Sequence, residues 1–65
     1  MKLIKLTEVI AINRNFERYF NADKIENFKR MTASTYLYMS TSSSAFVVVE
    51  TPEEIIQLIK QAEEI

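Results

Sequence analysis

The sequence predicts a small α+β domain, in which an antiparallel β-sheet of four to five strands in meander order precedes one C-terminal amphipathic α-helix. Three observations predict this class. Apolar and polar residues alternate in several short segments, polar stretches rich in Asn or Ser separate these segments, and helical periodicity is confined to the last 15 residues. A chain of 65 residues forms at most one domain, so we assign residues 1–65 to a single unit.

The first half of the chain is predicted to form three strands. Residues 2–8 alternate between apolar and polar side chains, and the apolar character continues to residue 12. The Asn-rich residues 13–15 indicate a first turn, which residues 16–20 follow as a second strand. Residues 21–24 predict a tight turn, because Asn and Asp side chains can bond to their own backbone. Residues 25–31 are predicted to form a third strand that contains a bulge.

The second half of the chain predicts a β-hairpin and a helix. Residues 34–40 and 46–49 are rich in β-formers and flank a serine-rich connector, which is typical of two strands in a hairpin. Thr51 then precedes Pro52 and has Glu54 three residues later, which is a capping box at the start of a helix. Apolar residues recur at helical spacing and predict a core-facing side, with an exposed partner face as the alternative. They are Ile55, Ile56, Leu58, Ile59, Ala62 and Ile65.

The sequence contains no Cys, His or Gly, and the absence of these three residue types excludes most site chemistry. Without Cys or His there is no disulfide, no thiolate nucleophile, no ordinary zinc or haem site and no common general base near neutral pH. Without Gly there is no glycine-rich phosphate loop. A chain of this size also has little room for both a core and a water-excluding pocket. We therefore predict a protein that is not an enzyme, with no catalytic residue, no cofactor and no metal.

The charges are nearly balanced, with a net charge of −1, but they are unevenly distributed. All but one of the eight basic residues lie in residues 1–31, whereas the last third is acidic. Solvated charge is the favoured interpretation of both regions. The alternative is a nucleic-acid-binding accessory protein that uses cations beside aromatic rings, as single-strand binders do. Its candidate residues are Lys24, Lys29 and Arg30, near Phe28, Tyr36 and Tyr38. The net charge makes nucleic acid the less favoured partner.

The cellular location is predicted from what the hydropathy pattern lacks. No apolar run approaches the roughly 20 residues of a membrane span. The N-terminal residues are charged and alternating, and they contain no signal-peptide core. We expect a cytoplasmic protein with no membrane partner.

The predicted hairpin is apolar on both faces, which favours self-association. Tyr36 and Tyr38 alternate with Leu37 and Met39, and all four residues 46–49 are apolar. A single helix covers only one face of a sheet, so the other face would leave a large apolar patch exposed. We therefore expect a homo-oligomer, with an unidentified further protein as another partner. The candidate interface residues are Tyr36, Tyr38, Phe46 and Val48. The alternative is an N-terminal strand pair that folds across and closes a small barrel.

Four short motifs, taken in order, are distributed over residues 2–58. They are residues 4–7 (IKLT), 20–26 (FNADKIE), 36–40 (YLYMS) and 46–56 (FVVVETPEEII). This order resembles the FlbD-like proteins, also called SwrD or swarming-motility proteins. Residues 9–15 and the serine connector depart from the short glycine turns of that family. A second resemblance, to the β-rich DNA-binding LytTR domains, rests on the asparagine turn and hairpin.

The resemblance to FlbD-like proteins implies a cellular context but no catalytic activity. It implies a bacterial, cytoplasmic, non-enzymatic protein encoded among flagellar genes, with no catalytic residues to carry over. Asn21, Asp23 and Glu50 match polar positions of the family pattern. Turn and cap hydrogen bonds are the favoured interpretation of these three residues.

Overall fold

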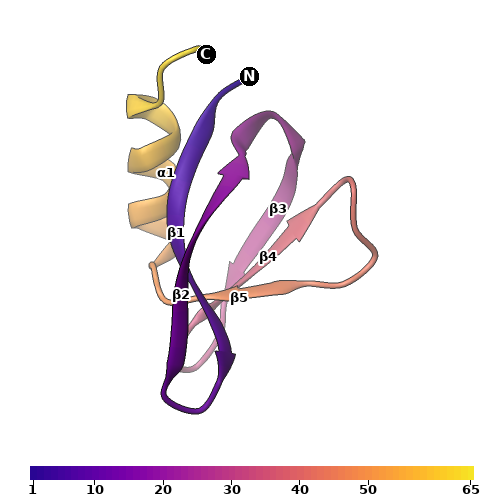
Figure 1. Ribbon diagram of the computed structural model, residues 1–65, viewed down its shortest axis with the longest axis vertical. Coiled ribbons are helices and arrows are strands. Elements are labelled where there is room, and N and C mark those ends of the chain that lie inside the picture. Colours follow the sequence, from indigo (N-terminus) through magenta and orange to yellow (C-terminus); the bar gives the residue numbers. More distant parts are fainter.

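The predicted α+β class is confirmed by a computed structural model that describes residues 1–65 (Figure 1). Five strands form one antiparallel sheet, and a single α-helix follows them. The elements are β1 (Leu3–Ala11), β2 (Arg14–Asn21), the 3-10 helix η1 (Ala22–Lys24), β3 (Ile25–Arg30), β4 (Thr35–Met39), β5 (Phe46–Val48) and α1 (Pro52–Gln61). No helix has the length and apolar character that crossing a membrane requires.

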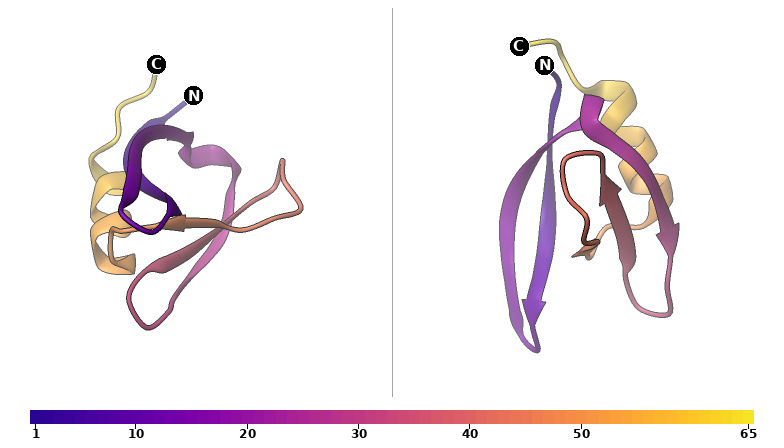
Figure 2. Two further views of the ribbon diagram at one scale, coloured as in Figure 1. Left: turned by 60° about the horizontal axis from the view of Figure 1, so that its bottom comes forward. Right: turned by 90° about the vertical axis from the view of Figure 1, so that its right-hand side faces the viewer.

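The strand order corrects one detail of the prediction. The order is β2-β1-β5-β4-β3 rather than a meander, because β1 pairs with β5 through Glu8 and Val48. This pairing brings Ile4 and Leu6 of β1 into the same core as Leu37 of β4, and burial of these side chains stabilises the order. The β1–β2 and β3–β4 hairpins splay apart in the right-hand view of Figure 2. The edge strands β2 and β3 are not paired, so hydrogen bonds do not close a barrel.

The two turns predicted in the first half of the chain are present, and an Asn residue stabilises each of them. Ile12 and Asn13 connect β1 to β2, and Asn13 has a φ of 62°, which Asn tolerates better than most residues. The turn therefore ends earlier than predicted, because β2 already begins at Arg14. In the second turn, the Asn21 Oδ1 accepts a hydrogen bond of 3.0 Å from the Asp23 backbone N–H and caps η1. The predicted bulge in the third strand appears as a register shift after Ile25.

The core consists of seven buried apolar side chains from four strands and the helix. They are Ile4, Leu6, Phe20, Leu37, Met39, Val48 and Ile55. The β4–β5 hairpin pairs Leu37 with Phe46 and Thr35 with Val48, so these residues share the face that points to the core. The buried Thr35 hydroxyl donates to the Glu50 carbonyl oxygen at 2.7 Å, which satisfies its hydrogen bonding.

The capping box predicted for the helix is present. The Glu54 backbone N–H donates to the Thr51 Oγ1 at 3.2 Å, and the Thr51 backbone N–H donates to the Glu54 Oε1 at 2.9 Å. The predicted apolar stripe is only partly buried. Ile55 is fully buried, Leu58 and Ile59 pack against the core at its edge, and Ile56 is 45% exposed. A helix of ten residues against a curved sheet buries a narrow strip of its surface.

We expect Thr51→Ala to lower the free energy of unfolding by about 1 kcal/mol, because it removes the acceptor for the Glu54 N–H. Urea denaturation monitored by circular dichroism measures this change. Thr41→Ala is the matched control, since Thr41 lies in an exposed turn. Equal midpoints for the two variants would contradict a stabilising cap.

Candidate functional site

The four predicted interface residues lie on two different faces of the sheet. Tyr36 and Tyr38 are half-buried on the outer face of β4. Val48 is 0% exposed and belongs to the core, which corrects its assignment to an interface. Phe46 lies on the core side as well, where its ring meets the Phe20 ring edge to face at a centroid distance of 5.3 Å. The physical reason is the antiparallel pairing, which turns opposite residues of β4 and β5 to the same side.

The predicted nucleic-acid residues do not form one basic strip. Lys29 and Arg30 are neighbours in β3, so their side chains point to opposite faces of the sheet. The Lys29 Nζ lies 6.0 Å from the centre of the Tyr38 ring on the outer face. Arg30 forms an ion pair with Glu53 at the start of α1, and Lys24 lies at the other end of β3, in η1. Phe28 packs against the core.

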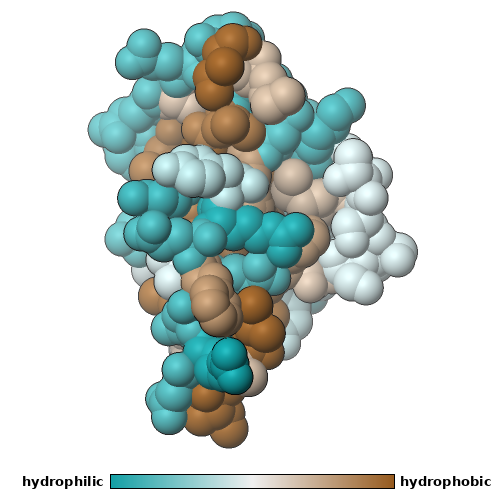
Figure 3. All heavy atoms as spheres, in the orientation of Figure 1, coloured by the Kyte–Doolittle hydropathy of each residue, from teal (hydrophilic) through white to brown (hydrophobic).

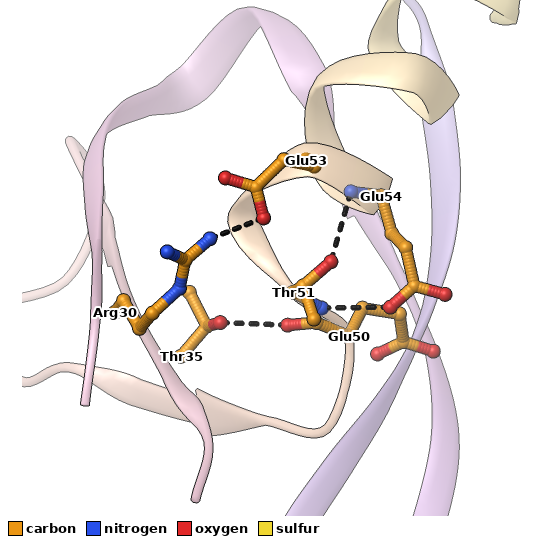
Figure 4. Close-up of polar contacts among 6 residues, drawn as sticks. All are labelled: Arg30, Thr35, Glu50, Thr51, Glu53 and Glu54. Carbon is orange, nitrogen blue, oxygen red and sulfur yellow. Dashed lines mark hydrogen bonds and ion pairs between the residues drawn. The ribbon is translucent and has the colours of Figure 1, made fainter. Parts of the chain in front are cut away.

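The acidic residues around the helix start form hydrogen bonds and ion pairs with neighbouring elements (Figure 4). The Glu50 carboxylate accepts hydrogen bonds from the Thr7 backbone N–H at 2.9 Å and from the Thr7 hydroxyl at 3.0 Å, which ties the β5–α1 connection to β1. The hydrogen bond from Arg30 is the main cause that holds the pKa of Glu53 below its ordinary value of 4.5. The N-terminal ammonium group likewise lowers the pKa of Glu64, to which it donates at 2.5 Å. Both ion pairs are exposed and therefore contribute little to stability.

The most exposed apolar side chains lie at the end of the β1–β2 hairpin. We call residues 9–16 the arm, because they extend past Glu8, where the pairing of β1 with β5 ends. Within the arm, Ile12 is 90% exposed, Ile10 is 61% exposed and Phe16 is 49% exposed. The turn of the arm projects at the bottom of Figure 1, and hydrophobic surface gathers there in Figure 3. The apolar run before the Asn turn is the sequence signal for this surface, although the pattern alone predicts only a continued strand.

A second surface feature is an open pocket of about 300 Å³ beside β2. Its lining residues are Arg18, Tyr19, Phe20, Asn21, Lys24, Met39, Thr41 and Phe46. The Arg18 guanidinium lies 4.9 Å from the centre of the Phe46 ring and also pairs with Glu8 at 3.0 Å. The two charged residues of the lining are both cationic. Phe20 and Met39 belong to the core and Phe46 packs against it, whereas Tyr19 is 65% exposed.

The arm and the pocket lie toward opposite ends of β2, so they are separate surfaces of one hairpin. Neither surface contains a cluster of three or more residues able to hold a metal ion. Both combine apolar side chains with exposed strand backbone, which is chemistry suited to contacts with other polypeptides. No protein-family model, curated protein or solved structure matches this chain.

Proposed function

We propose that this chain is a small, non-enzymatic protein-interaction module that associates with itself through the arm. The observation that carries the proposal is the exposure of Ile10, Ile12 and Phe16 at one end of the molecule. Isolated apolar residues are common on protein surfaces, but a group of them on a projecting hairpin marks an interaction site.

The arm lacks support from the rest of the fold. Its strands pair only with each other, through Val9 with Asn15 and Ala11 with Arg14. An isolated two-stranded hairpin is marginally stable in water, so contact with another surface would stabilise it. Burial of one large apolar side chain contributes about 1.5–3 kcal/mol. A second copy offers the same apolar surface, and a two-fold contact uses each arm once.

We expect the protein to sediment as a homo-oligomer and Ile12→Lys to shift it to a monomer of 7.6 kDa. The lysine places a charge at the most exposed apolar position of the arm, where burial against a second copy would remove its hydration. Ile56→Lys is the matched control, because Ile56 is an exposed Ile on α1, far from the arm in sequence. Sedimentation equilibrium at tens of micromolar protein measures the oligomeric state of the parent and of both variants. A parent protein that is already a single 7.6 kDa species would refute self-association.

The resemblance to FlbD-like proteins extends this proposal to a bacterial cytoplasmic setting in flagellar or swarming motility. Such a role requires a further protein partner, which the arm or the outer face of β4 would contact. Deletion of the gene from its native chromosome, complemented by the parent or by Ile12→Lys, would test this setting. Loss of swarming that only the parent restores is the expected result, and unchanged swarming on deletion would contradict it.

Nucleic-acid binding is the second candidate, because Lys29 lies beside the Tyr38 ring and opposite Tyr36. We expect no oligonucleotide to bind more tightly than the millimolar range at physiological salt, since Arg30 is paired with Glu53 and the net charge is −1. Fluorescence anisotropy with a labelled single strand measures this. A micromolar dissociation constant that rises steeply with salt, and that Lys29→Ala weakens, would favour nucleic acid over the arm proposal.

A further inference from the structure

We propose that the edge of β2 and the pocket beside it bind an extended peptide segment in which an apolar side chain is flanked by acidic residues. The segment would add as a sixth strand next to β2, a mode in which main-chain hydrogen bonds give affinity and side-chain pockets give specificity. This proposal does not rest on the arm, because the pocket lies at the other end of β2.

The pocket exposes strand backbone. Arg18, Tyr19, Phe20 and Asn21 all line it, and consecutive strand residues line one pocket only where the backbone edge faces it, since their side chains alternate. The Ala22 N–H donates to the Lys2 carbonyl oxygen at 2.7 Å, on the side toward β1. The alternation of an antiparallel ladder then directs the N–H and C=O of Phe20 and Arg18 toward β1. Those of Tyr19 point to the open side, where a new strand can bond to them.

The pocket also provides a place for one apolar side chain. A strand paired with β2 presents the residue opposite Phe20 on the same face as the Phe20 side chain. That face is the core side, where Met39 and Phe46 complete the apolar part of the lining. The pocket of about 300 Å³ has room for a side chain such as that of leucine. A bound peptide would therefore continue the core rather than cover a polar surface.

The charged residues of the lining determine which kind of peptide the pocket would favour. Arg18 and Lys24 are the only charged residues of the lining. Arg18 is paired with Glu8, whereas Lys24 forms no ion pair in this structure. Acidic residues two positions from the apolar anchor share its face, where the Arg18 guanidinium lies over the Phe20 ring, and would meet these cations. A second copy fits less well, because each of its edge strands carries a net positive charge. In β2, Arg14 and Arg18 outnumber Glu17, and in β3, Lys29 and Arg30 outnumber Glu26. Charge complementarity therefore favours an acidic segment of another polypeptide.

The probe is an acetylated and amidated peptide of eight residues, the length of β2. It carries alternating Thr and Val around a central leucine, with an aspartate two residues from the leucine on each side, so that leucine and aspartates share one face. Titration of the full-length, isotope-labelled protein is expected to shift the backbone amide resonances of residues 18–21 and to leave those of α1 in place. The peptide with alanine for leucine, the peptide with lysines for aspartates, and the peptide N-methylated on its bonding edge should each bind at least about tenfold more weakly. These peptide variants cannot perturb the folding of the protein.

Three protein variants test the same site through substitutions in the protein rather than in the peptide. Lys24→Glu should weaken binding about fivefold by reversing a charge at the pocket, whereas Lys29→Glu, the same change on the outer face, should not. Ile12→Lys should bind the probe as the parent does, which separates this site from the arm. Absence of binding at millimolar peptide would overturn the proposal, and so would shifts confined to β3 or equal binding of the leucine and alanine peptides.

Discussion

Val48→Lys is expected to leave the protein unfolded. Val48 is fully buried between Thr35 of β4 and Glu8 of β1, at the point where the two hairpins of the sheet meet. An ammonium group at this position would lie in the core without a partner, which costs several kcal/mol. A chain of 65 residues has a total stability of only about 3–10 kcal/mol, so this single change is sufficient to unfold it.

The neighbouring residue supplies the control for this experiment. Val49→Lys introduces the same charge next to Val48, where the side chain is 48% exposed, and should fold normally. Far-ultraviolet circular dichroism and the dispersion of the amide proton spectrum distinguish the two outcomes. A folded, monomeric Val48→Lys protein derived from an oligomeric parent would instead place Val48 in an interface between copies.

Ile55→Ala is expected to lower the free energy of unfolding by about 2–5 kcal/mol. Ile55 is the fully buried residue of α1, and its side chain joins the helix to the core of the sheet. Truncation to Ala removes buried methyl groups and leaves a cavity that the curved sheet cannot collapse to fill. Ile59→Ala should cost less than Ile55→Ala, because Ile59 is only partly buried.

The adjacent Ile56, which is partly exposed, is the matched control on the same helix turn. Ile56→Ala should change the stability by less than about 1 kcal/mol, since little buried surface is lost. Urea denaturation of the three variants gives the comparison. Should Ile55→Ala and Ile56→Ala unfold at the same urea concentration, the helix would not contact the sheet through Ile55.

Local structure was predictable because the residues that determine it are close in sequence. Thr51 and Glu54 lie three positions apart, and their two hydrogen bonds form wherever this segment begins a helix. The same holds for Asn21 and Asp23, whose bond caps η1. Periodicity of two and of 3.6 residues likewise depends on near neighbours, which is why all five strands and the helix were predicted.

The order of the strands was not predictable from local signals. The contact between Glu8 and Val48 joins β1 to β5. The alternation of apolar and polar residues within a strand does not indicate which other strand it pairs with. For the same reason, the sequence predicts Val48 in an interface, whereas the structure buries it in the core. Each strand of the β4–β5 hairpin is apolar on both sides, so only the pairing with β1 determines which side is buried.

The arm and the pocket are consequences of tertiary structure as well. Ile10 and Ile12 are exposed because β1 is longer than the region that β5 pairs with, a difference that appears only once the sheet is assembled. The pocket contains residues from β2, η1, β4 and β5, together with Thr41. Lys24 was singled out from the sequence for its charge, whereas Arg18, Phe20 and Met39 had no pattern that linked them.

The pairing of β1 with β5 also determines how this small chain must fold. The β1–β2 hairpin and the β3–β4–β5 unit each form from residues that are near in sequence, so each forms quickly but is weak alone. The β1–β5 contact joins residues separated by most of the chain, and the entropy of closing that long loop is lost before the core is complete. We therefore expect docking of the two units to be the slow step of folding. Until it occurs, the apolar faces of both units are open to other chains.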